Sequence, residues 1–334
     1  MPSTVVVGGF FGDEGKGKII SYLSKKDNPS IVVRGGAGPN AGHTIKDGNT
    51  TYKVRMLPSG FLNKNTKVMI GPGVVVNPDI FFKEIQEFGA SGRTFLDKHC
   101  GIIEQSHLDQ DSKGGLKEKI GSTGSGTGPA NAERAMRTLK MAKDVESLSS
   151  YVIDVPDEVN SALKDQKNVL IEGTQGTHLS LWHGTYPFVT SKDVTASGIC
   201  ADIGIGPKHV DEVLVVFKAY LTRVGSGPMP NELSAKETEQ KGWAEFGTVT
   251  GRPRRAAEFD FDLARRAIML NSATQLAITK LDVRFPECAG VKSFNDLSDE
   301  AKSFIKNIEG KLQVPVTLIG TGPLVDDVID IRSD

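Results

Sequence analysis

The sequence lacks the features that would place it in several special classes of protein. It contains no apolar run near the roughly twenty residues that cross a bilayer, and its first residues lack the basic region and apolar core of a secretory signal. A formal net charge of -1 provides no overall attraction to nucleic acid or to an anionic membrane. Only three cysteines occur, Cys100, Cys200 and Cys288, and they are too far apart for a metal-binding motif. We therefore expect a cytoplasmic protein with no nucleic-acid partner and no membrane partner.

The chain also lacks a fixed-period repeat, a low-complexity tract and a recognisable domain linker, so we expect one domain over residues 1–334. Its contents of 38% hydrophobic and 24% charged residues are ordinary for a globular chain. The 37 glycines are unusual, and they cluster in loops that follow short apolar runs. This arrangement predicts an α/β fold with a central, mostly parallel β-sheet, helices and long glycine-rich active-site loops, similar in layout to a P-loop NTPase.

The stretch that organises the chain is residues 5–18. Val5–Val7 predict a buried strand, the five glycines that follow predict a tight loop, and the apolar spacing after them predicts a helix. A glycine loop that enters a helix presents free backbone N–H groups and the positive end of the helix dipole, which together attract anions. The loop is not a P-loop signature, because five residues rather than four separate Gly9 from Gly15, and Gly17 replaces the magnesium-binding Ser or Thr.

Two charged residues of this loop suggest its chemistry. Lys16 adds a positive charge for a phosphate group, whereas Asp13 places a carboxylate where a phosphate would bind. An acid at that position repels the ligand unless it binds a metal ion or accepts a proton. The alternative is that Asp13 only caps the helix that follows.

Later loops repeat the pattern of a strand followed by small and polar residues. The loop of residues 35–44 contains His43, and the Gly/Ser/Thr stretch 121–129 leads into a helix expected from Ala130 to about Lys143. That stretch is either a flexible linker or a phosphate site beside Arg134 and Arg137. The loop 172–191 is long enough to suggest a function, and 222–228 is expected as a further loop.

Further strands are predicted at 31–33, 67–70, 169–171, 213–219, 276–278 and 316–319, and further helices at 78–88, 156–165, 262–270 and 298–309.

Two more loops carry charge. Residues 246–255 place three arginines among small hydroxyl residues, which indicates either an anion site or a solvated basic turn. Thr279-Lys280-Leu281-Asp282 resembles the Asn-Lys-x-Asp element with which GTPases read guanine. In that element the carboxylate accepts hydrogen bonds from guanine N1–H and the 2-amino group, and adenine lacks this pair of donors.

Taken together, the loops resemble those of the adenylosuccinate synthetase family. The matching motifs occur in the family's order along essentially the whole chain, and they are Gly12–Lys18, Asn40–Thr44, Gly173–Thr177, Gly184–Pro187 and Thr279–Asp282. The chain is shorter than bacterial members, chiefly between about 141 and 168 and after Asp282, and is similar to the compact archaeal form. The resemblance implies a GTP-dependent ligase that joins IMP to L-aspartate.

The resemblance also implies a mechanism. Asp13 would remove the N1 proton of IMP while GTP phosphorylates the C6 oxygen, and Asp13 and the carbonyl of Gly42 would hold Mg²⁺. Lys16 would stabilise developing charge, His43 would donate to the departing β-phosphate oxygen, and the aspartate amine would then displace phosphate from 6-phosphoryl-IMP. The implied catalytic residues are Asp13, Lys16, His43 and Gln175.

The binding residues that the resemblance implies fall into three sets, with Arg137 reaching the partner's site in a homodimer. For IMP they are Asp13, Asn40, Thr123, Arg137, Gln175, Thr190, Val224 and Arg252. For aspartate they are Thr248, Thr250 and Arg252. For GTP they are Gly12, Glu14, Gly15, Lys16, Gly17, Gly42, His43, Thr44, Arg254, Lys280, Asp282, Gly320, Thr321 and Gly322.

The sequence departs from the family at two positions in or beside the binding loops. Functions other than this ligase also remain open. Pro253 interrupts what is an all-arginine run in many members, and Gly320 stands where others have serine. The alternatives are a GTPase-like switch, a non-catalytic nucleotide-binding module, and the phage-type relative that joins aspartate to dGMP. Those phage enzymes commonly have serine at the position of Asp13, so the carboxylate favours IMP.

Overall fold

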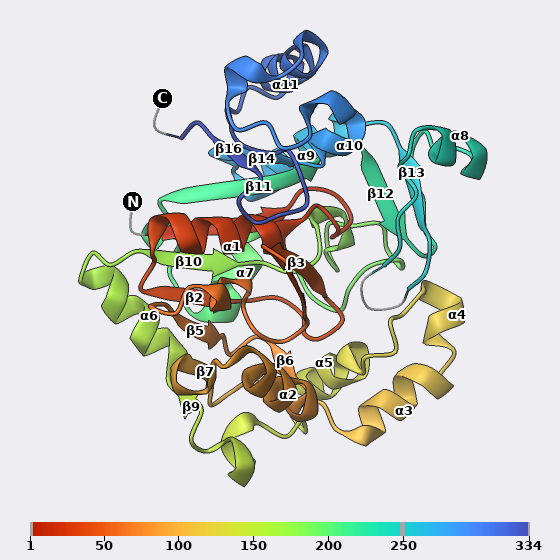
Figure 1. Ribbon diagram of the computed structural model, residues 1–334. Helices are drawn as coiled ribbons and strands as arrows, with labels where there is room; N and C mark the ends of the chain where they lie inside the picture. Colours follow the sequence, from red (N-terminus) through yellow and green to blue (C-terminus); the bar gives the residue numbers. More distant parts are fainter. Residues whose placement is uncertain (1–2, 248–250, 333–334) are drawn as a thin grey trace.

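A ten-stranded β-sheet runs through the computed structural model, which describes residues 3–247 and 251–332 (Figure 1). The strand order is β16-β15-β14-β11-β1-β10-β2-β5-β7-β9, and β16 is antiparallel to β15 while all the other neighbours are parallel. The strands are β1 Ser3–Gly8, β2 Ile31–Arg34, β5 Lys67–Ile70, β7 Thr94–Asp97, β9 Val152–Ile153, β10 Val169–Glu172, β11 Glu212–Lys218, β14 Gln275–Thr279, β15 Val316–Gly320 and β16 Val328–Asp330.

Helices and three small strand pairs surround this sheet. The strand pairs are β3 His43–Asp47 with β4 Thr50–Val54, β6 Val75–Val76 with β8 Gly101–Ile102, and β12 Leu221–Val224 with β13 Arg254–Ala257. The helices are α1 Lys16–Asp27, α2 Pro78–Phe88, α3 Gln105–Lys113, α4 Leu116–Ile120, α5 Thr127–Met136, α6 Val155–Lys164, α7 Ala196–Ile203, α8 Ala235–Gln240, α9 Phe261–Asn271, α10 Leu281–Arg284 and α11 Asp299–Leu312. None of the helices in the described residues is long and apolar enough to span a bilayer.

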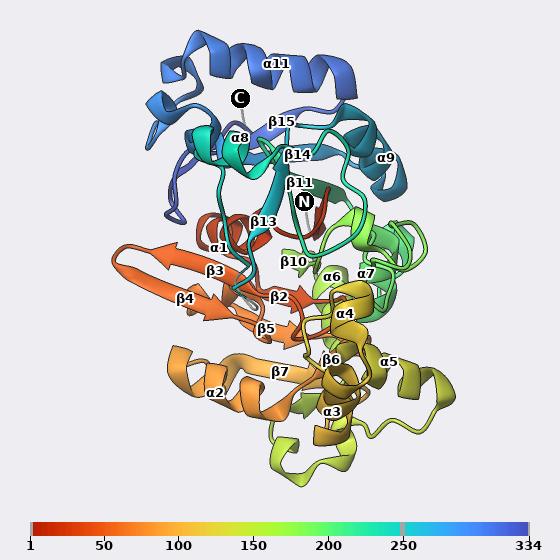
Figure 2. The ribbon, with the colours of Figure 1, turned by 90° about the vertical axis from the view of Figure 1, so that its right-hand side faces the viewer.

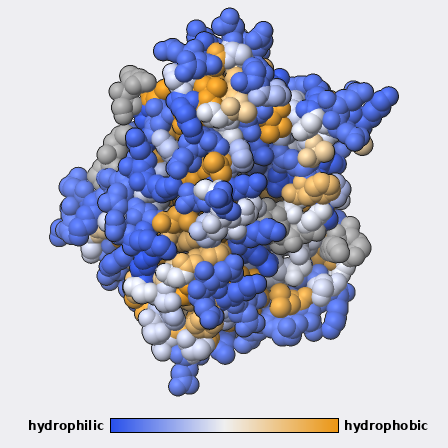
Figure 3. Space-filling model, viewed as in Figure 1, coloured by the Kyte–Doolittle hydropathy of each residue, from blue (hydrophilic) through white to orange (hydrophobic). Residues whose placement is uncertain are grey.

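Both faces of the sheet are buried, which explains why its strands read as continuous apolar runs. Val5 and Val7 of β1 belong to a core that includes side chains from α6, α7, α9 and α11. Val6, which points to the opposite face, belongs to a second core with side chains from α1, α2 and the β3–β4 hairpin. Figures 1 and 2 show α1 and α7 on opposite sides of the sheet, and α3, α4 and α5 grouped at one side of the molecule. In the view of Figure 1, the surface is mainly hydrophilic with scattered hydrophobic residues (Figure 3).

Most of the elements that the sequence predicts are present, and several begin and end within two residues of their expected limits. The start of α2 is confirmed in detail: Pro78 is its first residue, and the side chain of Asn77 caps it by accepting from the amide of Ile80. The expected α/β fold with a mostly parallel sheet is therefore confirmed.

Two expectations were wrong. The helix expected from Ala130 to about Lys143 is α5, which begins at Thr127 and ends at Met136. Arg137 follows it with a φ of 68°, and the chain then turns so that residues 140–142 hydrogen-bond with residues 100–102 instead of extending the helix. The segment expected as a loop at 222–228 begins inside strand β12, because this strand pairs with β13 some thirty residues later in the chain.

The parallel arrangement determines where the loops lie. Parallel strands place their carboxyl ends at one edge of a sheet, so the loops that follow β1, β2, β10, β14 and β15 converge there. All the motif loops identified in the sequence except the Gly/Ser/Thr stretch and the arginine loop follow one of these strands directly. The site is therefore expected at this edge.

Candidate active site

The loop between β1 and α1 has the backbone shape that its glycines allow. Gly12 and Gly15 have φ angles of 97° and 85°, in the left-handed region that favours glycine. Gly15 is the N-cap of α1 and no side chain caps the helix, so the interpretation of Asp13 as a capping residue is wrong. A Cβ at Gly17 would lie 2.6 Å from Cβ of His43, so the missing side chain lets His43 approach the first turn of α1.

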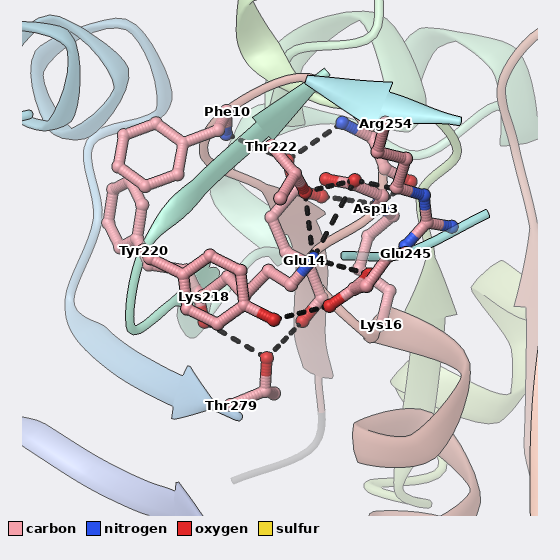
Figure 4. A network of polar contacts seen from close by, with 12 residues as sticks. Phe10, Asp13, Glu14, Lys16, Lys218, Tyr220, Thr222, Glu245, Arg254 and Thr279 are labelled. Atoms are coloured by element: carbon pink, nitrogen blue, oxygen red, sulfur yellow. Dashed lines mark hydrogen bonds and ion pairs between the residues drawn. The ribbon is translucent and has the colours of Figure 1, made fainter. Parts of the chain in front are cut away.

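Glu14 and Lys16 shape this loop from within. The side chain of Glu14 is fully buried, and its Oε1 atom accepts hydrogen bonds from the amides of Phe10 at 2.9 Å and Gly12 at 2.8 Å. Lys16, also buried, places its Nζ atom 3.0 Å from Oε2 of Glu14. The Thr279 hydroxyl donates to the carbonyl of Glu14 at 2.6 Å, which joins the end of β14 to the loop (Figure 4).

Asp13 points away from this buried pair into a separate polar network (Figure 4). The Thr222 hydroxyl donates a hydrogen bond to its Oδ2 atom. The Nε atom of Arg254 lies 3.3 Å from the same oxygen and Nζ of Lys218 lies 3.8 Å from it. Only 8% of the Asp13 side chain is exposed, so two cations compensate a largely buried carboxylate.

Glu245 connects those cations. It accepts hydrogen bonds from Lys218 at 2.8 Å, from the Tyr220 hydroxyl and from Arg254. Burial alone would raise the pKa of the Glu245 carboxyl, but the charges of Lys218, Lys280 and Arg254 and the hydrogen bond from Lys218 outweigh it and lower the pKa to about 2. Glu245 is therefore ionised and holds both cations beside Asp13.

His43 lies at the start of β3 and faces a second carboxylate. Its Nε2 atom is 3.1 Å from Oε1 of Glu172, which also accepts from the Ser59 hydroxyl at 3.0 Å. Burial lowers the pKa of His43 below its usual value, an effect that the charge of Glu172 opposes but does not cancel. The imidazole is therefore neutral at pH 7.

A cavity of about 430 Å³ lies beside Asp13. Its walls come from the loop after β1, the loop after β2, the Gly/Ser/Thr stretch, the 172–191 loop and the arginine loop. Of the residues that the family resemblance assigns to IMP, the cavity brings together all except Arg137, namely Asp13, Asn40, Thr123, Gln175, Thr190, Val224 and Arg252.

Several polar atoms of these residues are buried without a partner in the described structure. The Nδ2 atom of Asn40 donates to the Thr190 hydroxyl at 3.1 Å, but its Oδ1 atom has no hydrogen bond. Gln175 has a φ of 51°, and its Nε2 donor is likewise unpaired. Buried polar groups normally have partners, so these atoms indicate a polar ligand in the cavity.

The residues assigned to guanine form a second cluster, at the ends of β14 and β15. The Oδ1 atom of Asp282 is buried without a hydrogen bond, and burial raises the pKa of this carboxyl. Lys18 fixes the neighbouring loop by donating to the carbonyls of Gly322 at 2.6 Å and Asp327 at 2.7 Å. Burial lowers the pKa of Lys18 to about 8. These residues do not line the cavity, but Thr279 connects their strand to the loop between β1 and α1.

The remaining assigned residues lie in varied places. Arg137 is exposed and outside the cavity, and Thr44 is also exposed. Thr321 is buried and donates to the carbonyl of Val291 at 2.8 Å. Thr248 and Thr250 lie outside the described residues.

Sequence reasoning missed four polar residues that shape the site: Asp111, Lys218, Thr222 and Glu245. Asp111 borders the cavity and accepts hydrogen bonds from the amide of Gly126, at 2.8 Å, and from the Ser122 hydroxyl, which fixes the Gly/Ser/Thr stretch. The sequence contained one signal, and it concerned Lys218. This lysine ends the apolar run 213–217, and a lysine in a buried strand is unusual unless it is paired with another group.

Comparison with known proteins agrees with this geometry. The adenylosuccinate synthetase family model matches residues 5–145 and 138–287. The chain is 54% identical to adenylosuccinate synthetase of Methanococcus vannielii over 100% of both chains. It is 55% identical to that of Methanocaldococcus jannaschii over 99% of this chain and 97% of the relative.

Two solved structures are similar over nearly their whole length. Fully ligated adenylosuccinate synthetase from Plasmodium falciparum has a TM-score of 0.91 and 28% identity, covering 98% of this chain and 99% of that one. Succinoaminodeoxyadenylate synthetase of cyanophage S-2L, bound to dGMP and to dATP as an energy donor, has a TM-score of 0.83 and 26% identity, covering 99% and 96%. Four of the five motif loops contribute to one cavity, the family model matches most of the chain and the relatives match nearly its whole length, so the chain belongs to the adenylosuccinate synthetase family.

Proposed function

We propose that three parts of the chain together carry out the family's reaction. They are the cavity, the loop between β1 and α1, and the cluster of Lys280, Asp282, Gly320 and Gly322 at the ends of β14 and β15. The reaction is the GTP-dependent ligation of IMP and L-aspartate, which gives adenylosuccinate, GDP and phosphate. The observation that carries the assignment of roles is the position of Asp13, a carboxylate of the loop after β1 that lines the cavity. Its contacts with side chains of the described residues all use Oδ2 and none uses Oδ1.

Asp13 is the general base in this proposal. Its Oδ1 atom accepts the N1 proton of IMP, which makes the C6 oxygen more nucleophilic toward the γ-phosphate of GTP. The product, 6-phosphoryl-IMP, loses phosphate when the amine of aspartate attacks C6. General base catalysis typically contributes ~10²–10⁴ in rate.

The donor atoms beside this base fit Mg²⁺. Asp13 and Gly42 both line the cavity, and Mg²⁺ is usually held by one or two carboxylates together with substrate phosphates. When bound, the ion neutralises charge on the transferring phosphate. Asp13 and Gly42 are the residues that we assign to hold it.

Three other side chains act on the phosphate groups. Lys16 is fixed next to the loop amides by Glu14 and offsets negative charge there. His43 is neutral and its Nε2 atom lies 3.1 Å from Oε1 of Glu172, and we assign the ring proton to Nε2 because a carboxylate oxygen is an acceptor. We assign this donor to the β-phosphate oxygen of GTP, after the ring turns away from Glu172. The unpaired Nε2 donor of Gln175 serves the oxygen on C6.

Arginines complete the substrate sites. Arg252 lines the cavity and donates to the carbonyl of Gly121 at 2.9 Å, and we assign it to a carboxylate of aspartate together with Thr248 and Thr250. A guanidinium can form two parallel hydrogen bonds to such a group. We assign Arg137, exposed and outside the cavity of its own chain, to the IMP of a partner subunit in a homodimer.

A cytoplasmic location follows from the same reasoning as the sequence-based prediction. All three cysteines are free and buried. Burial raises the pKa of the Cys200 thiol to about 11 and also raises the pKa of the Cys100 thiol, so these thiols are poorly reactive. Free thiols of this kind are usual in a reducing compartment.

The test measures phosphate release from GTP with Mg²⁺ while IMP or aspartate is omitted, or while dGMP replaces IMP. We expect phosphate release only with the full set, and we expect Asp13→Asn to lower turnover by at least ~10²-fold. Asp299→Asn, on the exposed start of α11, is the matched control and should keep native turnover. Near-native turnover of Asp13→Asn would contradict the assignment of the base.

A further inference from the structure

The contacts of Asp13 are unevenly divided between its two oxygens. Among the described residues, the hydrogen bond from Thr222 and the ion pairs with Arg254 and Lys218 all use Oδ2. None of them uses Oδ1. The neighbouring side chains in the described residues therefore hold one oxygen of the carboxylate (Figure 4). The other oxygen is left without such a contact in a residue that lines the cavity.

The direction of the Thr222 hydroxyl follows from the chemistry of its other neighbour. Nζ of Lys218 lies 2.7 Å from Oγ1 of Thr222. An ammonium group has only donors, so the hydroxyl oxygen accepts from Lys218, and its single proton is left for another acceptor. That acceptor is Oδ2 of Asp13, which makes a directed series of two hydrogen bonds from Lys218 through Thr222 to Asp13.

Lys218 is itself held in place. It is 1% exposed at the end of β11, and the Glu245 carboxylate accepts from it at 2.8 Å. Glu245 also accepts from Tyr220 and Arg254, so its position is defined by three donors. The ammonium group thus has little freedom to leave Thr222.

We propose that Thr222 is a positioning residue for the reaction, and that Lys218 and Glu245 act through it. By holding Oδ2, the Thr222 hydroxyl turns Oδ1 of Asp13 toward N1 of the purine, so the series fixes the orientation of the base. This inference rests on the proposed role of Asp13. A displacement of about 1 Å at a reacting group can lower a rate by ~10²-fold, so the hydroxyl affects turnover more than substrate affinity.

Thr222→Val tests the inference because valine keeps the β-branched shape that suits strand β12 and removes only the hydroxyl. We expect kcat to fall by at least ~10-fold, the lower range for a hydrogen bond to a charged group. The KM values for IMP, GTP and aspartate should change by less than ~3-fold. Thr222→Ser restores the hydroxyl and should recover most of kcat. Native kcat in the valine variant, or a change in KM alone, would overturn the inference.

A matched control separates positioning from stability. Thr94 is a buried threonine on β7 whose hydroxyl donates to the carbonyl of Ala90 at 2.8 Å, far from the cavity in the strand order. Thr94→Val should lower the melting temperature without changing kcat. If Thr94→Val lowers kcat as much as Thr222→Val, the effect is structural and the inference is wrong. If the valine variant at 222 does not fold, Thr222→Ala is measured in the same way, with the same expected fall in kcat and the same overturning result.

A double-mutant cycle distinguishes this inference from the proposed function. If Thr222 acts through Asp13, adding Thr222→Val to Asp13→Asn should lower kcat by less than ~3-fold further, because residues in one network are not additive. Full additivity would overturn the inference while leaving Asp13 as the base. Near-native turnover of Asp13→Asn alone would instead refute the proposed role of Asp13.

Discussion

Replacement of Asp282 by asparagine tests the assignment of the guanine site. The Oδ1 atom of Asp282 is buried without a hydrogen bond, and burial already raises the pKa of this carboxyl. Guanine offers two donors to such a carboxylate, its N1–H and its 2-amino group, whereas adenine offers neither there. An unpaired buried polar group costs ~1–3 kcal/mol, so two of them cost ~2–6 kcal/mol. Since ~1.4 kcal/mol corresponds to tenfold, the native enzyme should prefer GTP over ATP by at least ~30-fold in kcat/KM.

The asparagine variant should change this preference in a defined direction. Its amide nitrogen would face the 2-amino group of guanine, so we expect kcat/KM for GTP to fall by ~10- to 150-fold, the value of a hydrogen bond to a charged group. The same amide can donate to the C2 carbonyl of xanthine, so xanthosine triphosphate should become a better substrate than it is for the native enzyme.

The assay follows adenylosuccinate formation by ultraviolet absorbance at saturating IMP and aspartate while the triphosphate is varied. Asp326→Asn is the matched control, because Asp326 is exposed and its carboxylate forms an ion pair with Lys25 at the surface. This control should keep the native preference. Equal use of ATP and GTP by the native enzyme, or an unchanged preference in Asp282→Asn, would refute the assignment.

Three further predictions concern His43, the proposed subunit contact of Arg137 and the buried carboxylate of Glu245. His43→Asn should lower kcat more than it raises the KM for GTP, because its donor acts mainly in the transition state, and steady-state kinetics that show only a KM change would contradict this. Mixing inactive Arg137→Leu and Asp13→Asn subunits should restore activity, up to about a quarter of native if exchange is statistical and sites act independently, and no recovery despite measured exchange would place Arg137 in its own site. Because the folded pKa of Glu245 is lowered to about 2, its stabilisation is complete above the unfolded value and is lost as pH falls toward 2. The melting temperature of Glu245→Gln should therefore depend less on pH than that of the native protein between about pH 5 and pH 2, and equal dependence would refute the network.

The sequence predicted the centre of the fold better than its periphery. The strands that carry valine and isoleucine runs were found because both faces of the sheet are buried. The short strand β7 and the edge strands β9 and β16 were not found, and the partner that makes β12 a strand lies some thirty residues away. Strand formation of this kind depends on tertiary pairing rather than on local composition.

The same limit applies to the site. Glycine loops, Asp13 and the guanine element are local signals, and the sequence alone identified them. Thr222 lies beside turn residues that suggested a loop, and nothing in the sequence states that Lys218 and Glu245 meet next to Asp13. These contacts depend on how distant strands are ordered in the sheet, which is information that a residue-by-residue analysis does not contain.

The bond between Thr279 and Glu14 has a consequence for the length of the nucleotide. The Thr279 hydroxyl, 2.6 Å from the carbonyl of Glu14, joins the strand that precedes Lys280 and Asp282 directly to the loop that follows β1. In the proposed function, the segment assigned to the base and the loop assigned to the phosphates are thus joined directly by this hydrogen bond. From the proposed assignment we therefore expect that a guanine nucleotide with one phosphate too few or too many would not bind its base at Asp282 and place its terminal phosphate beside Asp13 at the same time.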